Sequence, residues 1–358
     1  MTLHLSLCLL AFSLLSVSAE VTVERSPWGT SSSGEEVELF RIRDTKTGLQ
    51  AEVASYGALL STLGYLDDQG RVNSIVVMDD HSLAGAENGL WGHIVGRYAN
   101  RIDTGGFVID GQRHDLTTVH PRTGVHIHGG KTGLHRQVWA ATPLPAGVQL
   151  TITSPHGHEG YPGDLTVMVS YTLEHGTDLR ITYEATTTKP THLNLTNHAY
   201  FHLHPESKQS IRDHRLRLSS DHYLAIDKRK VPTGDLISVA NTSFDFRHET
   251  RIGDLIERAG GYDHCFIVRG EPGILRHAAT LTQAQAGLQL NVLTTQPGVQ
   301  LYTANHRKAP TFPLICFETQ HYPDTPNQST FPTTLLRPDE TFQEETVFRL
   351  TTTPSRTP

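Results

Sequence analysis

The most regular hydrophobic pattern in the chain lies in two neighbouring segments, 165–173 and 179–185. Apolar and polar side chains alternate along both segments, and the turn-forming stretch His175-Gly176-Thr177-Asp178 separates them. A period of two is typical of a strand with one buried face. The pattern therefore predicts two antiparallel strands joined by a short loop.

A third strand is expected directly afterwards, over 192–203. Leu193 and Leu195 fall on one face of it, and the other face is polar, with Asn194, Thr196 and His198. A polar face is unusual for a core strand, so these side chains are candidates for function.

Shorter strand-like runs recur along the rest of the chain, at 37–42, 49–53, 74–78, 148–152, 279–281, 288–293 and 347–350. Helical periodicity is clear only around Ile252, Leu255 and Ile256, where a helix of about three turns is expected. Many short strands with little helix predict packed β-sheets, as a sandwich or a barrel. No Ser/Gly/Pro-rich linker and no repeat divides the chain after the first twenty residues, so we expect one large all-β domain over 20–358.

Composition narrows the class of protein. Among the 358 residues, 37% are hydrophobic and 19% charged, which is typical of a globular protein with a sizeable core. The net charge of -7 is spread along the chain, and no run of Lys or Arg could follow a phosphate backbone or an anionic membrane. Nucleic acid is therefore not an expected partner.

The first nineteen residues resemble a secretory signal peptide. The run Leu5 to Leu15 has no acidic residue, and Val17-Ser18-Ala19 fits the small-residue cleavage rule. We expect cleavage before Glu20 and export to a periplasm or out of the cell. The alternative is a hydrophobic N-terminal strand, because no Lys or Arg lies near Met1. The run is too short to span a bilayer, so no membrane partner is expected after cleavage.

Three cysteines are present, and Cys8 would leave with the signal peptide. Cys265 and Cys316 could form a disulfide in an exported chain. We favour two buried thiols, because each cysteine lies within an apolar run and cysteine is among the most buried residues.

Histidine is abundant, at 22 residues, so context must select the functional ones. In Val125-His126-Ile127-His128-Gly129-Gly130, two histidines are expected on one strand face, followed by glycines that allow a sharp turn or a close approach to a ligand. A His-x-His pair could bind a metal. No spaced set of Cys and His supplies the further ligands, so a metal site is not predicted.

Three further side chains are candidates for acid and base chemistry. His198 ends the polar strand face, and imidazole titrates near neutral pH. Asp263 precedes an apolar strand and Glu318 follows one, where partial burial would raise the affinity of the carboxylate for protons. The alternative is a structural histidine bonded to Asn or Thr, with two carboxylates as surface charges at strand ends.

Taken together and in order, several motifs make the chain similar to the aldose 1-epimerase, or galactose mutarotase, family. They are Gly96-Arg97-Tyr98-Ala99-Asn100-Arg101-Ile102, His128-Gly129-Gly130, Asn194-Leu195-Thr196-Asn197-His198-Ala199-Tyr200-Phe201, Gly261-Tyr262-Asp263-His264, Gln296-Pro297-Gly298-Val299-Gln300, Phe317-Glu318-Thr319-Gln320, Tyr322-Pro323-Asp324-Thr325-Pro326-Asn327-Gln328 and Leu336-Arg337-Pro338. The resemblance covers about residues 40 to 350.

The resemblance implies a large antiparallel β-sandwich of the galactose mutarotase-like supersandwich type, a free aldose sugar as substrate, and no cofactor or metal. His198 matches the general acid and Glu318 the general base of the family, and His128 matches its second active-site histidine. The positions that match its sugar-binding residues are Asn100, Arg101, Asp263 and Gln300.

Two departures from the family pattern bear on substrate range. Val125 stands where the family often has Asn, three residues before the His of the His-Gly-Gly motif, and the segment 305–310 looks shortened. Three other functions stay open on the sequence: a carbohydrate-binding protein without activity, a sugar-phosphate epimerase, and a metal-dependent isomerase built on His126 and His128. The sequence carries no signal for oligomeric state or for the preferred aldose.

Overall fold

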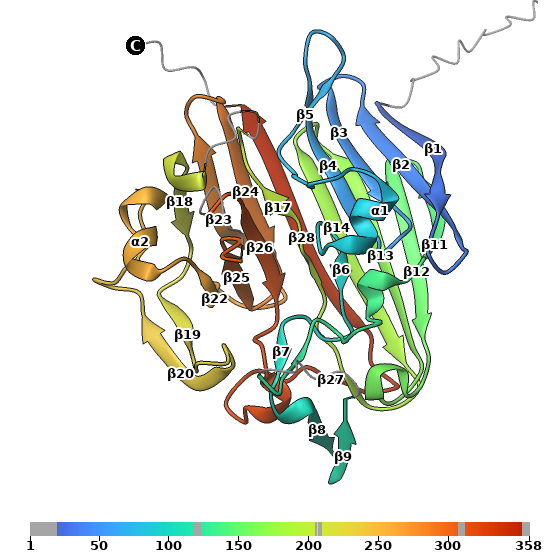
Figure 1. Ribbon diagram of the computed structural model, residues 1–358, viewed down its shortest axis with the longest axis vertical. Helices are drawn as coiled ribbons and strands as arrows, with labels where there is room; N and C mark the ends of the chain where they lie inside the picture. Colours follow the sequence, from blue (N-terminus) through green and yellow to red (C-terminus); the bar gives the residue numbers. More distant parts are fainter. Residues whose placement is uncertain (1–19, 117–122, 205, 207–209, 307–311, 353–358) are drawn as a thin grey trace, which may run out of the picture.

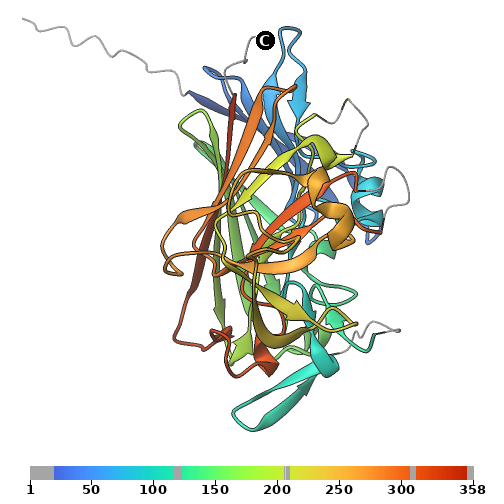
Figure 2. The same cartoon turned by 90° about the vertical axis from the view of Figure 1, so that its left-hand side faces the viewer.

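The computed structural model describes residues 20–116, 123–204, 206, 210–306 and 312–352. Every pairing between two of its named strands is antiparallel. In Figure 1 the largest sheet runs across the molecule, and two smaller sheets accompany it at opposite ends. Figure 2 shows the long strands of the largest sheet from the side, as one layer with the other sheets packed beside it. The predicted antiparallel sandwich is confirmed.

The largest sheet has nine strands. In spatial order they are β11 (Ala140–Leu144), β12 (Gly147–Ser154), β13 (Leu165–Glu174), β14 (Asp178–Thr187), β28 (Phe342–Thr352), β24 (Leu288–Thr294), β23 (Arg276–Gln283), β18 (Arg215–Leu218) and β21 (Thr250–Arg251). The two strands predicted over 165–185 are β13 and β14, and they pair from Leu165↔Thr187 to Glu174↔Asp178 as expected.

A five-stranded and a six-stranded sheet complete the two layers. The first consists of β1 (Val21–Thr30), β2 (Glu36–Asp44), β3 (Leu49–Ala54), β4 (Leu59–Leu66) and β5 (Val72–Ser74). The second consists of β17 (Tyr200–Phe201), β26 (Ile315–Gln320), β25 (Gly298–Tyr302), β22 (Asp263–Ile267), β19 (His222–Ile226) and β20 (Pro232–Ser238).

Short strand pairs and helical turns connect the sheets. The pairs are β10 (His126–Ile127) with β7 (Arg101–Ile102), β15 (Thr191–His192) with β27 (Leu335–Leu336), β16 (Thr196–Asn197) with β6 (Ile94–Val95), and β8 (Gly106–Ile109) with β9 (Gln112–Asp115). The helices are α1 (Leu83–Asn88) and α2 (Ile256–Ala259), with 3-10 turns at Asp103–Gly105, Leu134–Arg136, His158–Gly160, Ile211–Asp213, Ile252–Asp254 and Thr325–Asn327.

The core lies between the layers and follows from the period-two pattern. Along β13 buried residues alternate with partly exposed ones, and the partly exposed ones are polar apart from Met168. Val169 and Tyr171 of this strand belong to one hydrophobic cluster with Phe40 of β2 and Phe317 of β26. Each fully buried side chain of this size contributes about 1.5–3 kcal/mol, so packing between the layers supplies most of the stability.

The expectation of one continuous strand over 192–203 is wrong. The segment forms β15, β16 and β17, of two residues each, and they pair with three different partners. Asn194 explains one of the breaks: its side chain donates to the carbonyl oxygens of Ala99 and His321 and accepts from the N–H of His321. The polar side chain of Asn194 thus forms hydrogen bonds with the backbone of neighbouring segments, and it does not lie on the face of one continuous strand.

The other short predictions meet mixed outcomes. Six of the seven short runs predicted as strands lie within strands of the structure. The run over 74–78 does not, because β5 ends at Ser74. The helical pattern at 252–256 corresponds to a 3-10 turn followed by the single-turn α2, which is shorter than expected. The sequence pattern did not predict α1, because a helix of six residues is too short to show a helical period. Its N-cap is Ser82, whose Oγ accepts from the N–H of Gly85 at 3.2 Å.

Cys265 and Cys316 are both buried free thiols, as the apolar runs around them predicted. The proposed signal peptide, with Cys8, lies outside the described residues. No helix among the described residues is long and apolar enough to cross a membrane.

Candidate active site

Three neighbouring strands of the six-stranded sheet form the floor of the site. Glu318 of β26 pairs in register with Gln300 of β25, and Tyr302 of β25 pairs with Asp263 of β22. Residues opposite each other, and residues two apart on one strand, direct their side chains to the same face. The alternation therefore gathers Glu318, Gln300 and Asp263 on one surface. Glu318 lies within its strand and is 2% exposed, so the expected position at a strand end is wrong.

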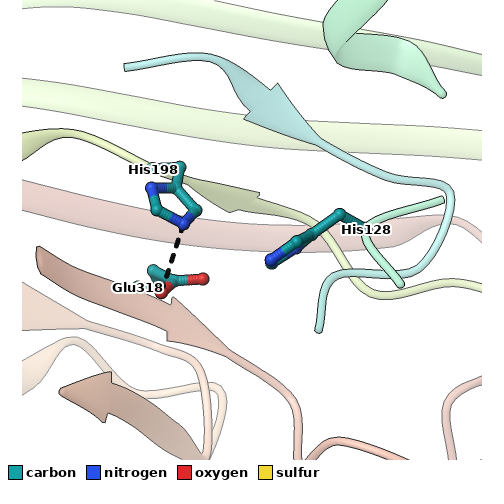
Figure 3. A group of neighbouring side chains, drawn as sticks. All are labelled: His128, His198 and Glu318. Carbon is teal, nitrogen blue, oxygen red and sulfur yellow. Dashed lines mark ion pairs between the residues drawn. The ribbon is translucent and has the colours of Figure 1, made fainter. Parts of the chain in front are cut away.

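His198 reaches Glu318 from the segment between β16 and β17 (Figure 3). Its backbone N–H donates to the carbonyl oxygen of His93 at 3.0 Å, which fixes the turn that presents the ring. His198 Nε2 lies 3.5 Å from Glu318 Oε1, and its Nδ1 lies 3.8 Å from the sulfur of Cys316. Histidine and carboxylate are thus paired and buried, with both side chains at most 4% exposed.

His128 completes a group of three side chains, and Figure 3 shows its ring directed toward His198 and Glu318. It follows β10 with φ 53°, and Gly129 continues in the left-handed region with φ 77°. The backbone N–H of Asn100 donates to His128 Nδ1 at 3.2 Å. The ring centroids of His128 and His198 are 5.5 Å apart.

A ladder of polar side chains continues from Glu318 toward the surface. Gln300 donates from Nε2 to Asp263 Oδ1 at 2.7 Å. Asp263 Oδ2 accepts from Lys230 Nζ at 2.6 Å and contacts Arg101 Nη2 at 3.4 Å. The side-chain oxygen of Asn100 accepts from both the backbone and the guanidinium of Arg101. All seven residues that the sequence singled out as site residues therefore lie in one connected region.

Burial shifts the acid and base groups of this region toward their neutral forms. The pKa of Glu318 is raised to about 8, chiefly by desolvation and then by the charge of Asp263, while Arg101 opposes the shift. Desolvation lowers the pKa of His198 to about 4 and the pKa of His128 well below its usual value. The predicted direction for Glu318 is confirmed. Burial thus favours a neutral carboxyl group beside a neutral imidazole, so that the pair shares a single proton.

Two buried oxygen atoms of the site have no hydrogen-bond partner among the described residues: Glu318 Oε2 and Gln300 Oε1. Leaving a buried acceptor unpaired costs about 1–3 kcal/mol. The Gln300 amide nitrogen is already committed to Asp263, so its oxygen must receive a donor from elsewhere. Both atoms are acceptors for hydroxyl groups, which indicates a ligand rich in hydroxyls.

Comparison with known proteins decides the family. The model of the aldose 1-epimerase family matches residues 38–349. The chain belongs to the aldose 1-epimerase family.

Relatives within the aldose 1-epimerase family are similar over nearly their whole length. The galactose mutarotase of Mus musculus is 37% identical over 344 residues, which cover 92% of this chain and 98% of that protein. The galactose mutarotase of Homo sapiens is 36% identical over 345 residues, with the same coverage. The crystal structure of galactose 1-epimerase from Lactobacillus acidophilus superimposes with a TM-score of 0.80 at 26% identity, covering 93% of this chain and all of that one.

The site of this aldose 1-epimerase does not form around a His126 and His128 pair. His126 packs against the ring of Tyr161 at 5.5 Å, whereas His128 contacts His198, because the left-handed backbone at His128 ends the strand alternation. Among the described residues, the side chains of metal-ligating type that lie close together are His128, His198 and Glu318, with donor atoms within 4.8 Å of one another. The expected shared face for the two histidines is therefore wrong.

Sequence reasoning missed Lys230 and the aromatic side chains beside His198. Tyr200 and Tyr302 flank His198 with ring centroids 5.1 and 6.3 Å away, and Trp91 packs on Tyr200 at 5.4 Å. Tyr200 lies in a matched motif and was a visible candidate. Lys230 lies in a polar turn and reaches Asp263 only through tertiary structure, so no local signal marked it.

The two departures from the family pattern have different outcomes. Val125 is 1% exposed, so it packs as a core residue and leaves no polar group at that position. The short segment over 305–310 lies largely outside the described residues, which end at 306 and continue from 312.

Proposed function

We propose that the protein opens the ring of a free aldose at the His198 and Glu318 pair and closes it on either face of C1, which interconverts the α and β anomers. The observation that carries the proposal is the buried pair itself, 3.5 Å apart, beside an acceptor oxygen without a partner. Ring opening requires that O1 loses a proton while the ring oxygen gains one. One acid and one base fixed in the same small volume meet that requirement.

Glu318 acts as the base and His198 as the acid in this mechanism. An incoming O1 hydroxyl donates to Glu318 Oε2, and a hydrogen bond to the charged form lowers the pKa of a carboxyl group. The proton of the pair then moves across 3.5 Å to His198 Nε2. The carboxylate removes the O1 proton, and the imidazolium protonates the ring oxygen.

Closure returns both protons to their starting groups. The open-chain aldehyde rotates about C1–C2 and the ring hydroxyl attacks its other face, so the product is the opposite anomer. The reaction consumes nothing and needs no cofactor. Each positioned acid or base contributes roughly 10²–10⁴-fold to the rate.

The remaining site residues hold the sugar. His128 contacts it beside His198, and Gln300 and Asp263 accept from its hydroxyl groups. Arg101 stabilises charge that develops on the sugar and orients Asn100. The substrates proposed are free hexoses such as glucose and galactose, and the proposed signal peptide over residues 1–19 would deliver the enzyme to a periplasm or out of the cell.

The test is an anomer-exchange assay on freshly dissolved α-D-glucose and α-D-galactose, followed by polarimetry or by NMR exchange spectroscopy. The wild-type protein should accelerate exchange, and His198→Asn should lose most of the acceleration. His175→Asn is a matched control, because that side chain is 75% exposed in the loop between β13 and β14. Sugar binding without faster exchange in the wild type would instead indicate a carbohydrate-binding protein without activity.

A further inference from the structure

The two ring nitrogens of His198 have different partners. Nε2 lies 3.5 Å from Glu318 Oε1, and Nδ1 lies 3.8 Å from the sulfur of Cys316. Figure 3 shows the first contact, with the second ring nitrogen directed away from Glu318. Both partners belong to β26 and are two residues apart, so their side chains lie on the same face of the sheet. One strand therefore contacts both nitrogens of the ring.

The backbone holds Cys316 beside the ring. Strand β26 lies between β17 and β25, and Cys316 pairs with Tyr200 of β17 on one side and with Tyr302 of β25 on the other. Because Tyr200 follows His198 by only two residues, the pairing of β17 with β26 also fixes the position of the imidazole. Cys316 is a buried free thiol, so bulk water does not compete with its sulfur for the contact to Nδ1.

A neutral histidine has two tautomers, and the proposed chemistry requires one of them. Nε2 can take the proton of Glu318 only if the hydrogen of the neutral ring is on Nδ1. The O–H bond of Glu318 then breaks as the Nε2–H bond forms, and the same proton passes on to the ring oxygen of the sugar. The Nδ1–H bond stays intact throughout. Which nitrogen carries the hydrogen depends on the partners of the ring.

The second histidine of the site shows how a partner fixes the tautomer. The backbone N–H of Asn100 donates to Nδ1 of His128, so a neutral His128 carries its hydrogen on Nε2. Nδ1 of His198 faces a sulfur atom instead. The neutral carboxyl group of Glu318, which burial favours, donates to Nε2 of His198 and leaves the hydrogen on Nδ1. The sulfur of Cys316 is then the acceptor for Nδ1–H.

A neutral thiol suits this position better than a charged acceptor. Burial raises the pKa of the Cys316 thiol well above its usual value, so the sulfur carries no charge. A carboxylate beside Nδ1 would stabilise the imidazolium by a charge-assisted hydrogen bond and would weaken it as an acid. A thiol sulfur is a weak acceptor. It orients the ring and leaves the imidazolium of His198 able to protonate the ring oxygen.

We propose that Cys316 is a positioning residue, whose sulfur accepts the hydrogen bond of His198 Nδ1–H and thereby keeps Nε2 free to carry the proton between Glu318 and the ring oxygen of the sugar. The proposal rests on the anomerase function above and adds to it a residue that acts through His198. Nδ1–H becomes a stronger donor when the ring is protonated, so the hydrogen bond should strengthen as the reaction proceeds.

Nitrogen NMR measures the tautomer directly and without sugar. In protein labelled with ¹⁵N-histidine at pH 7, a ring nitrogen that carries hydrogen differs in chemical shift from one that does not, and the signals of His198 are those that disappear in His198→Asn. The wild type should carry the hydrogen on Nδ1. Cys316→Ser keeps an acceptor and should do the same, whereas Cys316→Ala should show a mixture with the Nε2–H tautomer.

Anomer exchange measures the consequence for the rate. Cys316→Ala should lower kcat for hexose exchange about fivefold to tenfold, which corresponds to one hydrogen bond, and should leave KM near the wild-type value. Cys316→Ser should recover most of the rate. Cys265→Ala is the matched control, because it removes the other buried free thiol of the same sheet, whose sulfur lies close to Gly298. It should keep the wild-type kcat and the wild-type signals of His198.

The outcomes separate this proposal from the proposed function. Hydrogen on Nε2 in the wild type, or the same tautomer in wild type and Cys316→Ala, would overturn the role of Cys316 while normal exchange still supports the anomerase. An equal loss of kcat in Cys265→Ala would show that any lost thiol disturbs the sheet, and would also overturn it. The wild-type spectrum decides the tautomer even if Cys316→Ala fails to fold. Absence of exchange in the wild type would instead remove the proposed function itself.

Discussion

Replacement of Glu318 by Gln should abolish most activity and at the same time stabilise the protein. The amide has nearly the same shape as the carboxyl group, but it cannot take the O1 proton. Turnover should therefore fall roughly 10²–10⁴-fold, the contribution of one positioned base. Sugar binding should persist, because the other contacts of the site remain.

The gain in stability follows from the pKa of Glu318, which is about 8 in the folded protein against an ordinary value of 4.5. A raised pKa means that the folded state prefers the protonated group, so stability is fully present below pH 4.5 and is lost as pH rises toward 8. At pH 7 the loss is about 3 kcal/mol at most, at about 1.4 kcal/mol per pKa unit. Gln at this position escapes that loss because it does not ionise.

Thermal unfolding measures the effect. A chain of this size has an unfolding entropy of about 0.7 kcal/mol per kelvin, so the variant should melt roughly 4 °C higher at pH 7 and only about 1 °C higher at pH 5. Glu271→Gln, in an exposed turn, is the control and should give no pH-dependent increment. Near-normal exchange rates in Glu318→Gln, or an equal change in Tm at both pH values, would refute the reasoning.

Three further predictions concern pH, backbone geometry and export. The kcat/KM for hexose exchange should be bell-shaped, because the one-proton form of His198 and Glu318 exists between their pKa values of about 4 and about 8; a profile flat up to pH 10 would contradict the assignment. Gly129→Ala should lower the free energy of unfolding by roughly 3 kcal/mol or more, because a Cβ at this position, with φ 77°, would lie 1.8 Å from a backbone oxygen. Gly157→Ala is the control: its φ is 84° but the space around it is open, so the same denaturant titration should show a much smaller loss. Intact-mass analysis of exported protein should find residues 1–19 removed, and a full-length mass in that fraction would contradict the signal peptide.

Local patterns in the sequence were sufficient for much of the fold. The alternation over 165–185 predicted β13 and β14 with their loop, because the period of two reflects burial of one strand face and needs no knowledge of distant residues. The ordered motifs also singled out His198, Glu318 and the positions that we propose bind the sugar. The structure places these residues in one region, although their motifs are far apart in the chain.

Tertiary structure alone decided how those residues act. It divided 192–203 into three short strands with different partners, and it separated His126 from His128 through a left-handed residue. It also brought Lys230 onto Asp263 from a turn with no local signal. These features depend on contacts between segments far apart in the chain.

The protonation of the site depends on tertiary structure for the same reason. A glutamate in sequence has an ordinary pKa, and only removal of water by three packed strands raises the pKa of Glu318 to about 8 while the same burial lowers that of His198 to about 4. Sequence therefore determined which titratable groups are present. The low dielectric created by packing determined where their shared proton resides, because desolvation is a property of the folded surroundings and not of the residue.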